Sequence, residues 1–288
     1  MQPFETVSIE SARRSFAEEL CRINGISSPA VLAAFSTVPR ERFAGTGPWM
    51  IQPSGAQTFT ESADPSDVYQ DALIVLDPAK RLNNGQPSLW AVHLSLLDVH
   101  PGDHVLHLGC GAGYYSAILA ELVGPHGHVV AVEIDQALAD RARIALEPWP
   151  QVTVLHGDGA RGPFDPANAI VVSAGATHPL PAWLAALKLE GKLLFPLTPT
   201  HGPGAMVYIT CKDTDLFAAT LCGSVFFVDF EGARDTTISD ELARALKRDH
   251  GFSVRSLRCD AHVKEDSCWL HGNGWCFSRR APIATRAS

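Results

Sequence analysis

Between residues 101 and 200 the sequence alternates between short apolar runs and helical patterns, and this alternation constrains the fold more than any other feature. Strands joined by helices of about 10–15 residues form parallel sheets through right-handed crossovers. The segment therefore predicts an α/β fold with a parallel sheet flanked by helices. The predicted strands are HVLHLG, VVAVEID, VTVLHG, AIVVSAG and KLLFPL, and the predicted helices between them are YYSAILAELV, QALADRARIAL and LPAWLAALK.

Two further stretches flank this core. The first begins with two helical patterns, and a third pattern over residues 88–97 predicts a helix that Ser88 or Asn84 would cap. Residues 45–66 are rich in Gly, Pro, Ser and Thr, which predicts a long surface loop. The sequence after residue 200 adds strand patterns and one helix that close the sheet, partly antiparallel. We therefore expect an N-terminal helical and substrate-segment region at 1–100, a core at 101–235, and a C-terminal helix and strand extension at 236–288.

Composition excludes several classes of protein. Hydrophobic residues make up 46% of the chain and the net charge is −8, so we expect a folded protein that does not bind nucleic acid. No run of 18 or more apolar residues occurs, so we expect no membrane span. The acidic N-terminal stretch lacks the apolar centre of a signal peptide, so we expect none there. The seven cysteines show no C-x-x-C spacing, which predicts reduced thiols and a cytoplasmic location. The oligomeric state stays open.

A glycine-rich turn joins the first predicted strand of the core to the following helix. It reads Leu108-Gly109-Cys110-Gly111-Ala112-Gly113. Glycines there let a ligand approach the backbone and leave the N–H groups of the helix free. The spacing disfavours a nicotinamide dehydrogenase, because Tyr114 stands where the third glycine of G-x-G-x-x-G is required. By itself the turn fits a tight turn without a ligand equally well.

Two acidic residues follow the next two predicted strands. Glu133 ends the second strand, where a carboxylate can accept both hydroxyls of a ribose, and Asp158 follows the third, where it can accept from an adenine amino group. Taken alone, Glu133 fits a solvated acid at the end of a strand, and Asp158 fits an ordinary turn residue. In this order after the glycine turn, they predict a nucleoside site. The predicted binding residues are Leu108, Gly109, Cys110, Gly111, Gly113, Glu133, Ile134, Asp158 and Gly159.

Further short motifs surround these residues in a fixed order. They are Gly25-Ile26, Val31-Leu32, Val38-Pro39-Arg40-Glu41-Arg42-Phe43, Tyr69-x-Asp71, Ala174-Gly175-Ala176, Pro181 and Gly191-Lys192-Leu193-Leu194-Phe195-Pro196-Leu197. With the glycine turn and the two acids, this set resembles the class I S-adenosylmethionine (SAM) methyltransferases. The resemblance implies their Rossmann-like α/β fold, with a central, mostly parallel seven-stranded sheet flanked by helices. More narrowly, residues 12–235 resemble the protein-L-isoaspartate O-methyltransferase family. The resemblance implies SAM as the cofactor and methylation of a carboxylate.

One departure from the family pattern lies in the segment Asn83–Ser88. The resemblance aligns Gly85 with the serine that family members place beside the methyl group and the isoaspartyl carboxylate, so this chain offers no hydroxyl there. A plain Asn-Asn-Gly turn is the simpler interpretation of the segment. His178, on a loop after a predicted strand, can face the acceptor or be an ordinary exposed loop histidine. The candidate catalytic residues are Asn84, Gln86, Ser88 and His178.

The departure changes the expected substrate. A carboxylate is ionised at neutral pH and needs no general base, which fits the lack of an obvious catalytic His/Asp pair. We therefore predict O-methylation of a carboxylate in a small metabolite or a modified peptide, rather than repair of isoaspartyl proteins. The alternatives are N-methylation or hydroxyl O-methylation of a specialised metabolite, and a SAM-binding module without catalysis.

Three cysteines and a histidine near the C-terminus have the spacing C-x8-C-x2-H-x4-C. This spacing matches no common zinc module, and cysteines in strand patterns are usually buried small apolar residues. We therefore expect no metal. The four residues are Cys259, Cys268, His271 and Cys276.

Overall fold

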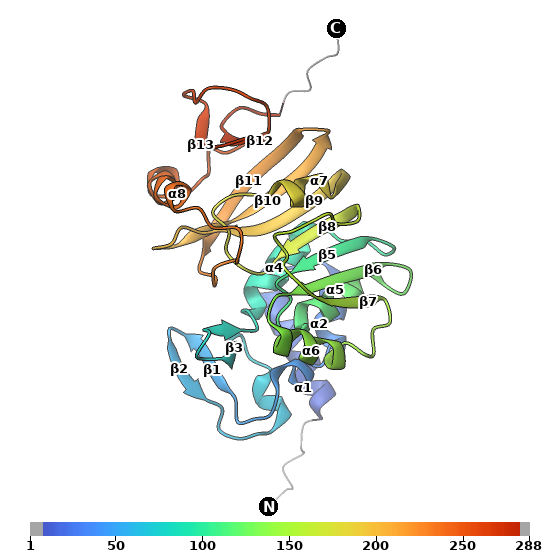
Figure 1. Ribbon diagram of the computed structural model, residues 1–288. Helices are drawn as coiled ribbons and strands as arrows, with labels where there is room; N and C mark the ends of the chain where they lie inside the picture. The colour runs from blue at the N-terminus through green and yellow to red at the C-terminus, as the bar shows by residue number, and fades with distance from the viewer. Residues whose placement is uncertain (1–7, 283–288) are drawn as a thin grey trace, which may run out of the picture. The chain divides into compact units, whose positions relative to one another are not determined.

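The computed structural model describes residues 8–282, which Figure 1 colours along the chain. Two compact units interleave in the sequence. The N-terminal unit comprises Met1–Gly102 and Cys110–His156, and the C-terminal unit comprises Asp103–Gly109 and Gly157–Ser288. Within the described residues, no helix has the length and apolar character needed to cross a membrane. Residues 1–7, part of the stretch in which we expect no signal peptide, lie outside the described residues.

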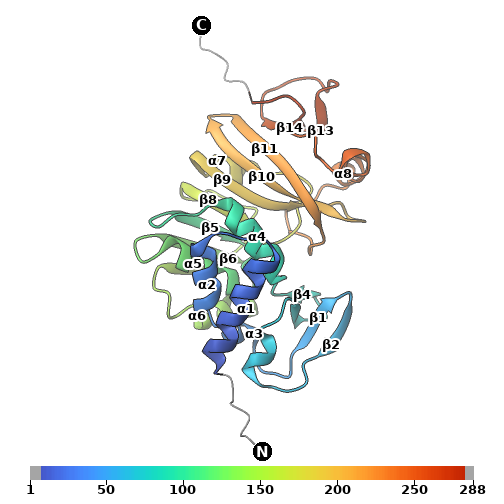
Figure 2. The same ribbon diagram turned by 180° about the vertical axis from the view of Figure 1, so that it is seen from behind.

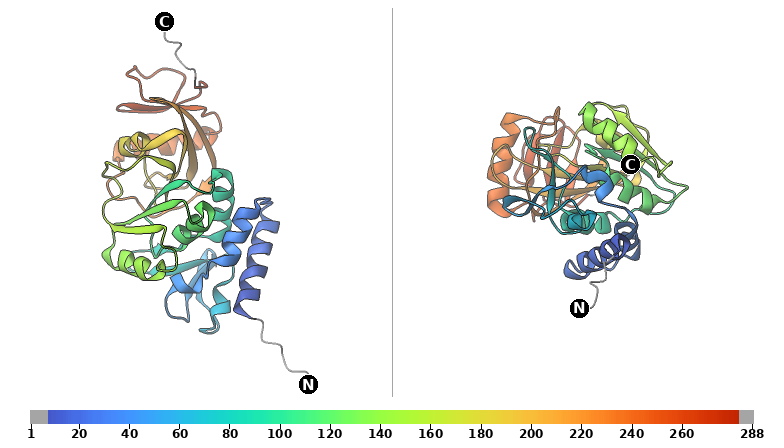
Figure 3. Two further views of the ribbon diagram at one scale, coloured as in Figure 1. Left: turned by 90° about the vertical axis from the view of Figure 1, so that its right-hand side faces the viewer. Right: turned by 90° about the horizontal axis from the view of Figure 1, so that it is seen from below.

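Three helices begin the N-terminal unit. The hydroxyls of Ser8 and Ser28 accept hydrogen bonds from N–H groups in the first turns of α1 (Ile9–Ile23) and α2 (Pro29–Thr37), so both helices begin at a capping residue. The two helices lie side by side, as the blue ribbons of Figure 3 show. The short α3 (Glu41–Ala44) follows. The two helical patterns expected here from the sequence are confirmed.

A buried arginine fixes the chain between these helices and the next sheet. Arg40 is 0% exposed, and its guanidinium donates to the backbone oxygens of Val68, Gln70 and Ala72 at 2.7, 2.6 and 2.5 Å. Only arginine offers several donors in one rigid plane, so it can hold three carbonyls of one segment at once. Arg40 therefore orders the segment that leads to Asp71.

The long loop expected over residues 45–66 is wrong, because this stretch contains a β-hairpin, visible in Figure 2. Trp49 and Ile51 are buried in a small core with Val68 and Ile74. The second strand of the hairpin is exposed along its length, so it lacks the alternation that marks a half-buried strand. The elements of this region are β1 (Met50–Ser54), β2 (Ala56–Phe59), the 3-10 helix η1 (Pro65–Val68), β3 (Leu73–Asp77) and β4 (Leu82–Asn83), and the sheet has the order β2-β1-β3-β4.

The rest of the N-terminal unit follows the predicted alternation. β6 and β7 pair in parallel, and α6 between them begins where the Asp135 carboxylate accepts from the Leu138 N–H. Nearly every side chain of α5 is buried, which explains its almost continuous apolar sequence. The elements are α4 (Pro87–Leu97), α5 (Tyr114–Val123), β6 (His128–Glu133), α6 (Gln136–Ala145) and β7 (Val152–His156).

The C-terminal unit contains a long mixed sheet whose strands have the order β13-β14-β12-β11-β10-β9-β8-β5. The pairs β5–β8 and β8–β9 are parallel, whereas β9–β10 and every later pair are antiparallel. The strands are β5 (His104–Leu108), β8 (Ala167–Val172), β9 (Leu187–Leu197), β10 (Gly204–Asp213), β11 (Leu216–Val225), β12 (Ser256–Arg258), β13 (Cys268–Gly272) and β14 (Trp275–Ser278). Two helices, α7 (Pro181–Ala185) and α8 (Thr236–Asp249), complete the unit.

The α/β fold is confirmed, but the seven-stranded, mostly parallel sheet is wrong in detail. The sheet of the C-terminal unit alone has more than seven strands, and most of its pairs are antiparallel. The long strands β10 and β11 form a hairpin, and the short strands β12, β14 and β13 continue the sheet beyond it. The partly antiparallel strands expected after residue 200 are confirmed, and because hairpins add strands without crossover helices, they extend the sheet beyond seven strands.

Candidate functional site

The glycine turn leaves open space beside two of its glycines. Gly109, which follows the buried Leu108 at the end of β5 in the C-terminal unit, and Gly111, in the N-terminal unit, have φ of +75° and +57°. A Cβ added to Gly109 would meet no atom nearer than 3.9 Å, and at Gly111 none nearer than 4.0 Å. Packing within the protein therefore does not require glycine at either position. Left-handed backbone beside open space suits the close approach of a ligand.

Gly113 has a different role. It precedes α5 with φ +96°, and a Cβ there would lie 2.8 Å from Leu146 Cδ1 and 3.2 Å from Leu146 Cγ. The Leu146 side chain would have to shift, so glycine lets α5 begin close against the end of α6. Packing alone explains this glycine, and its predicted contact with a cofactor stays a prediction.

Glu133 is buried at the end of β6, with 6% of its surface exposed. Its Oε2 accepts from the Gly111 N–H at 2.7 Å, and its Oε1 accepts from the Asp135 N–H at 2.9 Å. Each carboxylate oxygen keeps a further lone pair for a ligand hydroxyl. The neighbouring Ile134 is 43% exposed, an apolar side chain beside a carboxylate. The structure thus brings Glu133 to the glycine turn and holds it in one orientation.

Cys110 lies inside the same turn. Its side chain is buried, and this burial, together with the nearby Glu133 carboxylate, raises the pKa of the Cys110 thiol well above its ordinary value. A protonated thiol is a poor nucleophile. Cys110 therefore acts as a small apolar residue that fills the turn.

Asp158 and Gly159 follow β7 in the C-terminal unit. Asp158 Oδ1 accepts from the Ala160 N–H at 2.8 Å, and Oδ2 lies 2.9 Å from Arg161 Nε. A Cβ on Gly159 would lie 3.0 Å from Phe230 Cζ, so a side chain there would require this neighbour to shift by a few tenths of an ångström. The carboxylate of Asp158 thus makes the local turn that the simpler interpretation expects, and its contact with an adenine stays a prediction.

The candidate catalytic segment forms a tight turn before α4. Asn83 Oδ1 accepts from the Gly85 N–H at 2.9 Å, as in an Asn-Asn-Gly turn. Asn84 is buried, and its Oδ1 accepts from the Ile74 N–H at 2.9 Å. Within the described residues, the buried Asn84 Nδ2 has no hydrogen-bond partner. A buried donor without a partner is costly, so Asn84 is the residue of this segment whose hydrogen bonding is incomplete.

Asp71 holds the other two candidates of the segment. Its Oδ1 accepts from the backbone N–H of Ser88 at 2.8 Å, and its Oδ2 accepts from Gln86 Nε2 at 3.1 Å. The predicted capping by Ser88 or Asn84 is wrong. Gln86 occupies the N-cap position, its side chain makes no capping hydrogen bond to the helix, and Asp71 accepts from the Ser88 N–H in the first turn instead. The motif Tyr69-x-Asp71 carries this residue, but the sequence pattern does not reveal what the carboxylate contacts.

Two aromatic rings leave no room for a side chain at Gly85. Gly85 has φ +75°, and a Cβ there would lie 2.5 Å from Trp90 Nε1 and 3.0 Å from Tyr115 Cε2. The two rings lie 5.0 Å apart between centroids, and Tyr115 Oη donates to the Gly85 oxygen at 3.1 Å. The position that the resemblance aligns with the family serine therefore has no room for a serine side chain, because its Cβ would overlap Trp90. Sequence reasoning identified Gly85 but not the two rings that surround it.

His178 lies in the C-terminal unit, half-buried and stacked on Trp275 with 5.9 Å between ring centroids. Its Nδ1 lies 2.9 Å from Thr177 Oγ1. Burial lowers the pKa of His178, so the ring is neutral at pH 7. The ring is packed rather than fully exposed, and its predicted role as a base stays a prediction.

Replacing Asp71 by alanine should destabilise the start of α4. The change removes the acceptor of the Ser88 N–H, and loss of such a capping interaction typically costs about 0.5–2 kcal/mol. The free energy of unfolding from denaturant titration measures it. Asp77→Ala, which removes an exposed acceptor of the Ala79 N–H in the same unit, is the matched control and should cost less. Equal stability of Asp71→Ala and the wild type would contradict the capping role.

Comparison with known proteins agrees with this geometry. The sequence profile of the family described as Protein-L-isoaspartate(D-aspartate) O-methyltransferase (PCMT) matches residues 12–235. A protein-L-isoaspartate O-methyltransferase of Methanothermobacter thermautotrophicus is 32% identical over 228 residues, which cover 76% of this chain and 95% of that protein. One of Protochlamydia amoebophila is 32% identical over 219 residues, covering 75% and 94%.

Solved structures share the fold. A protein-L-isoaspartate O-methyltransferase aligns with a TM-score of 0.64 and 24% identity over 82% of this chain and 69% of its own. A Plasmodium falciparum structure described as a protein-L-isoaspartate O-methyltransferase, in complex with S-adenosyl-L-homocysteine, aligns with a TM-score of 0.62 and 18% identity over 76% and 98%. The match over residues 12–235, the open glycine turn and the buried acid at the end of β6 lead to one conclusion: the chain belongs to the protein-L-isoaspartate O-methyltransferase family and is a SAM-dependent methyltransferase.

Proposed function

We propose that this enzyme methylates a carboxylate in a small molecule or a modified peptide, and that it does not act on isoaspartyl residues in the way that its relatives' names describe. The packing around Gly85 carries this proposal. The family resemblance expects a serine hydroxyl beside the reacting groups, whereas here Trp90 and Tyr115 occupy the space that a serine would need. An acceptor suited to this turn must therefore be recognised by other groups.

The polar groups left in the segment favour an anionic acceptor. Asn84 Nδ2 is a buried donor without a partner within the described residues, and an acceptor oxygen is the group that would complete its hydrogen bonding. Gln86 is oriented by Asp71 at the start of α4. Amide donors stabilise a carboxylate but cannot deprotonate a neutral hydroxyl or an ammonium group, so these side chains fit an acceptor that is already ionised.

We infer that the glycine turn and Glu133 hold the cofactor. When bound, SAM supplies a methyl group on a cationic sulfonium. The open backbone at Gly111 gives room for close approach, Glu133 offers free lone pairs for the ribose hydroxyls, and the exposed Ile134 offers an apolar surface for a flat base. The chain's task is then to align the acceptor carboxylate and to exclude water, because the attacking oxygen needs no general base.

The chemical stability of the product tests the proposal. A carboxylate acceptor gives a methyl ester, which mild alkali hydrolyses to methanol, whereas N-methyl groups and alkyl ethers survive. Carboxylate-bearing peptides and metabolites are screened with methyl-labelled SAM, and S-adenosylhomocysteine release identifies an acceptor. We expect its label to become volatile after alkali, and we expect an isoaspartyl peptide to be a poor acceptor.

Each other result contradicts a defined part of the proposal. Label that resists alkali would assign N-methylation or hydroxyl O-methylation and would make His178 the candidate base. Turnover of an isoaspartyl peptide at the rate of a family enzyme assayed in parallel would assign repair. SAM binding without S-adenosylhomocysteine release across the carboxylate panel would favour a binding module.

A further inference from the structure

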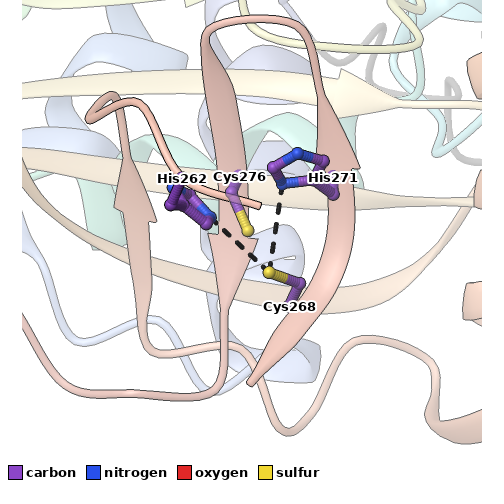
Figure 4. A group of neighbouring side chains, drawn as sticks. All are labelled: His262, Cys268, His271 and Cys276. Atoms are coloured by element: carbon purple, nitrogen blue, oxygen red, sulfur yellow. Dashed lines mark hydrogen bonds between the residues drawn. The ribbon is translucent and has the colours of Figure 1, made fainter. Parts of the chain in front are cut away.

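The C-terminal unit gathers two cysteines and two histidines that the proposals for cofactor and acceptor do not use. The ligand atoms of His262, Cys268, His271 and Cys276 all lie within 4.8 Å of one another. Figure 4 shows the four side chains pointing toward a common centre from the hairpin β13–β14 and the loop before it. We propose that these four residues bind one structural Zn²⁺ ion.

The distances fit a tetrahedral site. With Zn–S bonds of about 2.3 Å and Zn–N bonds of about 2.0–2.1 Å, neighbouring ligand atoms in a tetrahedron lie about 3.3–3.8 Å apart. Cys268 Sγ lies 3.6 Å from His262 Nε2 and 3.9 Å from His271 Nδ1. Two edges of the tetrahedron are therefore nearly formed. Two thiolates and two neutral imidazoles are a common structural set for zinc, and the thiolates balance the charge of the ion.

A β-bulge explains how residues three apart on one strand reach the same face. In a regular strand Cys268 and His271 would point to opposite faces. Here Cys268 is opposite Ser278 and His271 is opposite Cys276, with a shift in register between Cys268 and Leu270. Cys276 and Ser278 are two apart and share a face of β14, so the bulge brings Cys268 to the face of His271.

His262 is oriented as a ligand by its other ring nitrogen. Its Nδ1 lies 2.9 Å from the backbone oxygen of Asp260, which requires the Nδ1 proton and leaves Nε2 with a free lone pair toward Cys268. A ligand histidine usually makes such a second bond, because it fixes the tautomer and the orientation of the ring. Arg258 contacts the carboxylates of Asp260 and Glu265 at 2.7 and 2.6 Å and so holds both ends of the loop that carries His262.

The sulfur of Cys268 also has a backbone partner. The backbone N–H of Glu265 donates to Cys268 Sγ at 3.3 Å, and such a bond orients a ligand atom. Cys268 and Cys276 are 6% and 0% exposed, and both histidines are half-buried, so water has little access to the centre. The ion would tie the loop before β13 to the hairpin. The cluster has the spacing H-x5-C-x2-H-x4-C. It contains three of the four residues of the sequence pattern, and His262 takes the place of Cys259.

Metal content of the full chain tests the proposal directly. Protein purified from zinc-supplemented cells should contain about one zinc per chain by elemental analysis. Co²⁺ added to the metal-free protein should give the intense visible bands of a tetrahedral ion and a sulfur-to-metal charge-transfer band. X-ray absorption on the zinc protein should show two sulfur and two nitrogen neighbours.

Matched variants test whether His262, rather than Cys259, is the fourth zinc ligand. Cys276→Ser and His262→Ala should each lower zinc affinity at least about tenfold, measured by competition with a chromophoric chelator. Cys259→Ser, three positions from His262 and outside the cluster, should keep the wild-type affinity. The wild-type cobalt spectrum keeps the test valid if a ligand variant fails to fold.

Three results would overturn the proposal. They are a wild-type chain without zinc and without a tetrahedral cobalt spectrum, zinc binding that Cys259→Ser abolishes and His262→Ala does not, and an intact mass lowered by a disulfide between Cys268 and Cys276 in the protein as purified. Methyltransferase activity does not enter the readout, so this test is independent of the proposed substrate.

Discussion

Replacing Glu133 by alanine should weaken SAM binding by about tenfold to over a hundredfold. Hydrogen bonds to a charged group are typically worth about 1.5–3 kcal/mol, and each 1.4 kcal/mol is a factor of ten in affinity. In this chain the effect has two sources: the ribose loses its acceptor, and the Gly111 and Asp135 N–H groups lose the carboxylate that orients the turn. Calorimetric titration with SAM gives the change in dissociation constant.

Two further variants show whether a loss of SAM affinity in Glu133→Ala comes from the carboxylate itself. Glu133→Gln keeps one acceptor oxygen, so we expect an affinity between those of the wild type and Glu133→Ala. Asp140→Ala removes an exposed acid of α6 that pairs with Arg143, so its SAM affinity should equal that of the wild type. If Glu133→Ala folds and binds SAM as tightly as the wild type, the carboxylate at the end of β6 does not contact the cofactor.

Restoring the family serine should damage the protein rather than return its relatives' activity. In Gly85→Ser the new Cβ would lie 2.5 Å from Trp90 Nε1, in a backbone with φ +75°. Overpacking typically costs about 1–3 kcal/mol and a left-handed conformation about 1–2 kcal/mol more, so we expect a loss of roughly 2–5 kcal/mol. Denaturant titration measures the free energy of unfolding, and an assay with an isoaspartyl peptide should show no gain.

Gly55→Ser is the matched control for this variant. Gly55 has φ +85°, but a Cβ there would meet no atom within 4 Å, so the substitution isolates the cost of the backbone conformation. The difference between the two variants is the cost of the collision with Trp90. Equal stability of the two would mean that the turn can open around a side chain, and the argument that packing excludes a hydroxyl at position 85 would be lost.

The parts of the fold that the sequence predicts well are those set by local patterns. Glu133 stands at the end of an apolar run that is buried on both faces, so the run marks both the strand and the position of the acid. The glycine turn is similar, because Gly109 and Gly111 need a left-handed backbone that few other residues adopt. These features depend on a few neighbouring residues, and for that reason they can be read from one sequence.

The features that escape prediction depend on contacts between distant residues. The hairpin at residues 50–59 has one strand exposed along its length, so no alternation marks it. A side chain at position 85 would lie too close to the ring of Tyr115, which is 30 residues further along the chain. The bulge beside Trp269 changes which side chains share a face, so the strand periodicity misplaces Cys268 relative to His271. Register and close packing decide these cases, and neither follows from spacing alone.

The three hydrogen bonds of Arg40 connect the N-terminal helices to the segment that we propose binds the acceptor, residues 83–88. Arg40 follows α2 and grips the backbone from Val68 to Ala72, and Asp71 within that stretch holds Ser88 and Gln86. A region without cofactor motifs thus holds the proposed acceptor segment in place. If that proposal is right, divergence in these helices changes acceptor choice without changing the reacting groups, and a chimaera that exchanges the helices between family members carries part of that choice with it.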